Sequence, residues 1–493
     1  MTGAGARFVA VGLLVFGLLS GEARSAQLPE MPRIGGRLEG YGIIRFDRSS
    51  PGQYPFARLD VSAEQRVTRR LSWRLALVGR VGGPPDHASA GVFGLDRTFQ
   101  NFSPSLEYGD AYLDYSGDDF DLRVGMQKFF WGRLDSIQPN DLLSPRESED
   151  PFWTDAVDAK IAVPAIQGSY YPPITDGIEG WLSEPRITLV WEPIAVPWRF
   201  PVLGERWYPP AGIADPLLQV PAQPGLPCPC DITVTQQTSN SPAPARRFDN
   251  GNVGLQLSGR SAAVDWSLVF FDGYDPAPAF VVPIRLELQP DPEIGSVGTA
   301  FTQIRPAYER FQAIGGDFSF AADAFTVRGE ANWRFRRPYP MDLTDVADRV
   351  IADPAKVQAL LRGETIVEPS FAKRDSLAWG LGVDTLIAGF LPILEVYQLV
   401  LLNNDQPLLV QDVDTRLIAN VSRRFLRDQL EAEVSGIWGI ESGYELVRGL
   451  VTYDLTDDVE IRAGLLGIWG REQSLIGQYK RNSEFYGGVR YRF

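Results

Sequence analysis

Arginine is the residue type that dominates the chemistry open to this chain. The 493 residues include 47 Lys and Arg, of which only five are Lys, and a single His. A guanidinium donates paired hydrogen bonds to carboxylates and phosphates, so Arg is favoured in charged ladders along a wet interior and in sites for anions. One His, His87, does not favour a His-based nucleophilic triad, and we predict no enzyme, metal or cofactor. The net charge of −15 argues against a nucleic-acid-binding surface.

The elements that carry these arginines alternate between apolar and polar residues. The clearest case is the segment 325–336. One face holds Phe325, Val327, Gly329, Ala331, Trp333 and Phe335, and the other holds Thr326, Arg328, Glu330, Asn332, Arg334 and Arg336. A strand with one apolar face and one charged face can lie between lipid and a water-filled lumen. Segments 71–81 and 430–438 follow the same pattern.

Repetition of this pattern predicts an all-β fold, a transmembrane antiparallel β-barrel. Candidate strands begin near Ile34, Tyr54, Arg70, Ser105, Phe120, Asp158, Arg186, Gly251, Ala263, Phe311, Phe325, Ser376, Pro392, Thr415, Asp428, Glu445, Val459 and Asn482, which makes about 18 strands. Connections alternate between short turns and long segments, as in barrels with short periplasmic turns and long outer loops. The segment Tyr171 to Pro185 is long for a turn, and a miscounted hairpin there would give 16 strands.

Both ends of the chain indicate export to an outer membrane. Residues 1–26 have a positive residue, a short apolar core and a small polar region, which predicts a signal peptide for the general secretory pathway. Residues 27–493 then form a single barrel domain. The last strand places Val489, Tyr491 and Phe493 on one face and resembles the C-terminal assembly signal of Gram-negative outer-membrane barrels. This resemblance implies outer-membrane lipid and the barrel-assembly machinery as partners.

Two long loops have content of their own. In the loop 338–375, Asp353 and Pro354 predict the start of a short helix and Gly363 its end. This helix is either a cap on a surface loop or a lid folded into the lumen. The loop 193–250 is Pro-rich and contains Cys228-Pro229-Cys230, for which a local disulfide is a possible structural clip.

The segment 123–142, RVGMQKFFWGRLDSIQPNDL, is the sharpest local motif. It resembles a poorly characterised family of Gram-negative outer-membrane barrels with the pattern Arg-x-Gly-x-Gln, then Trp-Gly, then Pro-x-Asp, and more loosely the alginate-export barrels. The resemblance implies a transport or channel protein. The chain departs from the pattern by reading Gln-Pro-Asn-Asp, which puts a shared role for Asn140 in doubt. The segment either tucks a loop against the inner wall or contacts a solute.

The candidate residues of the lumen and its constriction come from this motif and from the strand 325–336. They are Arg123, Gln127, Trp131, Arg133, Asp135, Asp141, Arg328, Glu330, Arg334 and Arg336. We expect a channel or transporter for an unknown solute or polymer, with an Arg-rich lumen that favours anions and with a periplasmic partner as an open option. The alternatives are a transporter of hydrophobic substrates or lipids with a plugged lumen, and a structural or adhesive barrel without transport.

Overall fold

A computed structural model describes most of the chain. The described residues are 31–46, 53–82, 91–92, 104–148, 151–155, 157–173, 182–201, 206–207, 217–220, 232–238, 250–291, 295–341, 343–405, 408–472, 474 and 476–493. The predicted signal peptide, His87 and the two cysteines lie outside these residues. Within the described part, no helix has both the length and the apolar content needed to cross a bilayer.

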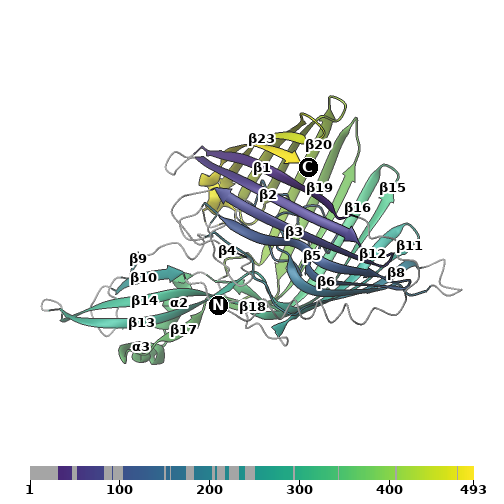
Figure 1. Cartoon of the computed structure of the whole chain (residues 1–493). Helices are drawn as coiled ribbons and strands as arrows, with labels where there is room; N and C mark the ends of the chain where they lie inside the picture. Colours follow the sequence, from purple (N-terminus) through teal and green to yellow (C-terminus); the bar gives the residue numbers. More distant parts are fainter. Residues whose placement is uncertain are drawn as a thin grey trace.

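The main body is a closed barrel of 18 antiparallel strands, as the sequence predicts (Figure 1). The ring consists of β1 (Arg33–Arg45), β2 (Gln53–Arg66), β3 (Leu71–Gly82), β5 (Ser105–Ser116), β6 (Phe120–Gln127), β7 (Val163–Tyr170), β8 (Ser183–Glu192), β11 (Asn252–Ser261), β12 (Val264–Tyr274), β15 (Arg310–Ala322), β16 (Phe325–Pro340), β18 (Phe371–Thr385), β19 (Phe390–Leu401), β20 (Val413–Phe425), β21 (Leu430–Gly439), β22 (Tyr444–Asp454), β23 (Val459–Gly470) and β24 (Glu484–Arg492). Pairing of β1 with β24 closes the ring, and a two-residue strand, β4 (Gly91–Val92), adds to β5 in parallel. The count of 16 is thereby excluded.

The seam between β1 and β24 is built on a close approach of two backbones. Gly36 and Phe493 exchange two hydrogen bonds, with N–O distances of 2.9 and 3.0 Å. A Cβ on Gly36 would lie 2.3 Å from the Asp60 carbonyl oxygen and 2.7 Å from the Phe493 ring, so only glycine fits there. Val489, Tyr491 and Phe493 all point outward and are about half exposed.

Strand β16 shows the predicted division between the two faces of the wall. Trp333 and Phe335 are exposed on the outside, whereas Glu330, Asn332 and Arg334 are buried inside the barrel. Because successive side chains of a strand point to opposite faces, this fixes the register of the neighbouring strands as well.

At one end of the barrel the strands are joined by turns of two to four residues, except between β7 and β8. The other end carries the longer connections together with the four-residue turn between β21 and β22. Strand β7 begins at Val163, five residues later than the predicted start at Asp158, because residues 157–159 form a turn. Part of the connection from β7 to β8 lies outside the described residues, but both strands pair as the 18-strand count requires.

A second sheet, which the sequence analysis did not predict, projects from the barrel on the side of the long loops (Figure 1). It consists of β9 (Leu217–Val220), β10 (Ile232–Thr238), β13 (Ala279–Asp291), β14 (Gly295–Ala307) and β17 (Ile366–Pro369). The alternating residues 284–289, Ile-Arg-Leu-Glu-Leu-Gln, carried a usable strand signal.

The loop 338–375 contains the predicted helix, but not in the lumen. Helix α2 (Leu343–Ile351) precedes α3 (Pro354–Leu361), whose N-cap Asp353 accepts a hydrogen bond from the Ala355 amide. Val346 and Val350 of α2 pack on Val282 and Ile284 of β13. Of the two alternatives, the cap on an outer loop is therefore the one found and the lid over the lumen is not, because α2 and Leu360 of α3 pack on the second sheet.

Candidate functional site

The described residues of the segment 128–162, hereafter the strap, follow β6 and precede β7 and lie in the barrel interior. Its residues contact inward-facing side chains of β15, β16 and β19 and, farther along, of β1, β2, β23 and β24. In the order of strands around the ring these two groups lie on different parts of the wall. The strap therefore reaches across the lumen and occupies part of its cross-section.

Two wall carboxylates hold the first half of the strap, and we call them the acidic anchor. Glu330 of β16 accepts hydrogen bonds from the backbone N–H groups of Arg133, Leu134 and Asn140, at 2.6 Å for Leu134 and 3.3 Å for Asn140. Glu395 of β19 accepts those of Asp135 and Ser136, at 2.7 and 3.1 Å. In the described part of the chain neither carboxylate forms an ion pair.

Gly132 allows the strap to approach this anchor. Its φ is +106°, a conformation that residues with a side chain rarely adopt. A Cβ at this position would lie 2.7 Å from both carboxylate oxygens of Glu330. The glycine of the Trp-Gly pair in the motif is therefore required by the backbone conformation at position 132.

Polar side chains fix the strap on either side of the acidic anchor. Asn140 is fully buried, donates to the Gly316 carbonyl (2.9 Å) and accepts from Asn332 (3.1 Å). Arg334 donates to the Pro139 carbonyl (3.1 Å). Asn140 is thus a wall contact of the strap in spite of the departure from the family pattern.

Two ion pairs flank these contacts. Arg133 of the strap pairs with Asp317 at 2.6 Å, and Arg328 of the wall pairs with Asp135 at 2.8 Å. Burial raises the pKa of Asp135, which Arg328 opposes.

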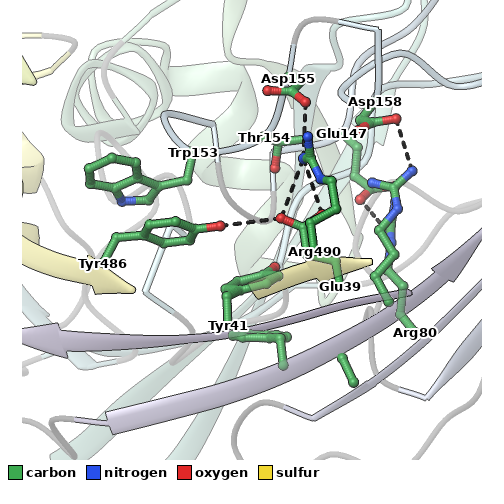
Figure 2. Close-up of a pocket in the computed structure, with 13 residues that line it drawn as sticks. Glu39, Tyr41, Arg80, Glu147, Trp153, Thr154, Asp155, Asp158, Tyr486 and Arg490 are labelled. Atoms are coloured by element: carbon green, nitrogen blue, oxygen red, sulfur yellow. Dashed lines mark hydrogen bonds and ion pairs between the residues drawn. The ribbon is translucent and has the colours of Figure 1, made fainter. Parts of the chain in front are cut away.

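Arginines of the opposite wall hold the second half of the strap, and we call Arg37, Arg58, Arg462 and Arg490 the basic anchor. Asp158 accepts from Arg37 and from Arg58 (3.1 Å), and Asp155 accepts from Arg490 (3.1 Å) and Arg462 (3.2 Å). Burial alone would raise the pKa values of these two carboxyls, but the arginines lower both below the usual range. Figure 2 shows Arg490 between Asp155 and Glu39.

An aromatic stack lies beside the basic anchor (Figure 2). The ring of Trp153 is stacked on Tyr486 of β24 at 4.7 Å, and its indole N–H donates to Glu484 at 2.5 Å. Tyr486 in turn neighbours Tyr41 of β1 at 5.5 Å. Trp153 is buried with Leu446, Leu466 and Ile468 of the wall, so this contact combines ionic and apolar packing.

The two halves of the strap meet at a buried ion pair beside an apolar cluster, and we call this region the base of the strap. The Lys160 ammonium pairs with Asp141 at 2.5 Å, and both side chains are 2% exposed. Burial lowers the pKa of Lys160 to about 8, although Asp141 opposes the shift. Trp131 packs nearby with Phe129 and Leu143 against the wall of β8, β11 and β12.

The structure brings most of the predicted site residues together. Those at the strap or its wall contacts are Trp131, Arg133, Asp135, Asp141, Arg328, Glu330 and Arg334. Arg123 and Gln127 also point inward, but Arg123 pairs with Asp114 at 3.2 Å and Gln127 binds the Ala165 carbonyl. Arg336 lies in a β-bulge with φ +51°, so the inward face passes from Arg334 to Arg337, which pairs with Asp275.

Sequence reasoning missed Glu395, Trp153, Asp155 and Asp158 as contacts between the strap and the wall. Glu395 had a signal, because it interrupts the apolar run 390–402 with a charge. The other three stand in an irregular stretch without periodicity, so nothing in the local pattern indicated their partners.

Many arginines of the barrel strands have a carboxylate partner. Such pairs are formed by Arg58, Arg74, Arg80, Arg123, Arg328, Arg416, Arg424, Arg448, Arg462, Arg490 and Arg492. The excess of Arg over Lys is therefore used largely in charge-paired wall ladders.

Comparisons with known proteins give only distant structural likenesses. No family model and no curated protein matches the chain. An engineered variant of the porin of Rhodopseudomonas blastica has 10% identity and a TM-score of 0.36, covering 94% of this chain and 100% of the porin. A variant of OccD1 (OprD) has 8% identity and a TM-score of 0.45, covering 96% of this chain and 97% of that one. Likenesses this weak carry no functional argument, and the barrel rests on its own strand pairing.

Proposed function

We propose that this protein is an outer-membrane channel in which the strap narrows the passage for a small hydrophilic solute. The single observation that carries this proposal is the strap, anchored on different parts of the wall of a closed barrel. A segment fixed at both anchors narrows a lumen to a constant width, and such a constriction selects solutes by size and hydrogen bonding.

The outer face of the barrel supports the membrane location. Large apolar side chains are exposed around the ring, among them Leu189, Leu268, Ile314, Trp333, Leu394, Val434, Leu465 and Phe485. An exposed apolar band of this kind is expected to face lipid tails. Val489, Tyr491 and Phe493 remain our candidates for the signal read by the barrel-assembly machinery.

We further propose a weak preference for anions. Arg334 is buried beside the strap and forms no ion pair in the described part of the chain, while Arg133 and Arg328 flank it. The peptide N–H groups on Glu330 and Glu395 offset the two negative charges there. Because many of the other wall arginines are charge-paired, the preference is expected to be small.

Planar-bilayer recording with the full-length protein tests the proposal. We expect steady single channels and a reversal potential shifted modestly toward anions. Conductance should be larger when residues 133–139 are replaced by a short Gly-Ser linker, because that replacement removes their side chains from the passage. A Gln substitution at Glu431, whose carboxylate pairs with Arg424 and not with the strap, is the matched control. If the wild type and the linker variant both pass no current, the channel proposal fails, and a plugged transporter or a structural barrel replaces it.

A further inference from the structure

We propose that Glu330 and Glu395 are positioning residues that keep the passage open only while they are ionised, so that acid closes the channel. This inference rests on the proposed channel function. It concerns how the strap is held rather than what passes it.

The hydrogen bonds of the acidic anchor all run in one direction. Five backbone N–H groups of the strap donate to two side chains, both about 5% exposed or less. An ionised carboxylate accepts such bonds through both oxygens, and bonds to a charged acceptor are about twice as strong as neutral ones. A protonated carboxyl presents an O–H to the same donors, so protonation weakens the attachment of residues 133–140.

The charged groups around the two carboxylates bind other atoms of the strap and not these amides. Glu330 faces Arg133 and Asp317, which pair with each other, and its own strand carries Arg328 and Arg334. Glu395 faces Asp135 from the strap and Asp384 from β18, and both of these acids pair with Arg328. These ion pairs and the Arg334 bond to the Pro139 carbonyl also join the strap to the wall, so protonation of the two carboxylates loosens residues 133–136 rather than freeing the strap.

Geometry sets the direction of the movement. Lys160 and Asp141 join the two halves of the strap to each other, and Asp155 and Asp158 keep it bound to the basic anchor. Residues 133–136 lie against the wall at β16 and β19, so loosening their amide bonds lets them move away from that wall. That movement takes them toward the centre of the lumen, and acid therefore narrows the passage.

Two measurements on the full-length protein test this inference. Conductance is recorded from pH 8 to pH 4 for the wild type, Glu330→Gln, Glu395→Gln, the double variant and the control Glu431→Gln. Amide hydrogen exchange of residues 133–140, corrected for its intrinsic pH dependence, reports the attachment of the strap without requiring current.

We expect the wild type and the control to lose about half or more of their conductance on acidification. The double variant is expected to show the low conductance already at pH 8 and to be insensitive to pH. In Glu330→Gln the amides of Arg133, Leu134 and Asn140 should exchange about tenfold faster, with less change at Asp135 and Ser136.

Unchanged exchange and an unchanged pH profile in folded double variants would overturn the inference, as would higher conductance in acid. If no protein passes current but exchange accelerates as expected, the anchor is real and the channel proposal is at fault. If current flows and exchange does not respond, the channel stands and the positioning role falls.

Discussion

The two anchors of the strap bind it by opposite chemistry. At the acidic anchor, carboxylates of the wall bind the backbone of the strap, so the contact depends on the course of the chain and on Gly132. At the basic anchor, guanidinium groups of the wall bind side chains of the strap, so the contact depends on Asp155 and Asp158. Substitutions at Asp135 and Ser136, whose backbone amides make the contact, are therefore expected to be tolerated better than substitutions at Asp155 and Asp158.

The largest expected effect is at the aromatic stack beside the basic anchor. Trp153→Ala removes a buried ring and leaves a cavity, which should lower the free energy of unfolding by about 3–5 kcal/mol. Trp153→Phe keeps an aromatic ring and should lose less. Urea unfolding followed by heat-modifiable gel mobility measures both, and equal losses would contradict the role of the stack.

The next prediction compares the loss of stability on substituting one strap carboxylate at each anchor. Asp158→Asn weakens contacts to Arg58, which is buried, and to Arg37, which is partly buried, and should destabilise the protein by about 3 kcal/mol. Asp135→Asn removes a more exposed pair while keeping the backbone bond to Glu395, and should cost less than about 1 kcal/mol. If the two substitutions had equal effects in the unfolding assay, the anchors would not differ as described.

A substitution at Gly132 tests the acidic anchor without changing the basic anchor. Gly132→Ala forces a side chain into a positive-φ position against Glu330 and should cost about 2 kcal/mol. Gly168→Ala on β7 is the control, because no atom lies within 4 Å of the added Cβ. Thermal unfolding of the two variants should differ clearly, and an intact Tm for Gly132→Ala would show that this close approach is unimportant.

The smallest effect concerns the buried pair of Lys160 and Asp141 at the base of the strap, outside both anchors. The pKa of Lys160 is lowered to about 8, so above that pH the unfolded chain binds more protons than the folded one. Stability should therefore rise between pH 8 and pH 9, by about 1 kcal/mol. The gain should be absent from Lys160→Met in denaturant titrations at the two pH values, and an equal gain in the variant would assign it to another group.

The barrel was predictable from the sequence because its signal is local. Alternation on segments such as 325–336 and the spacing of short turns are set by neighbouring residues, and the 18-strand count follows from them. The bulge at Arg336 escaped notice because it depends on how β16 meets β18. The helix start at Asp353 was also a local signal and was predicted correctly. The second sheet, on which α2 packs, was not predicted.

The strap contacts were predictable in part only. The Trp-Gly step and the following Asp marked the segment as special, and Glu330 and Arg334 could be placed on the inner face by alternation. Which wall carboxylate meets which amide depends on residues almost 200 to 260 positions apart, as for Leu134 with Glu330 and Asp135 with Glu395. No periodicity in one sequence encodes such a pairing.

The second sheet joins three outer loops into one hydrogen-bonded structure. Strand β10 comes from one loop, β13 and β14 from the next, and β17 from a third, and hydrogen bonds join them in one layer. An excision from any one of these loops exposes a bare strand edge on another. Loop exchange between relatives, which ordinarily treats each loop as a separate module, would here have to transplant all three at once.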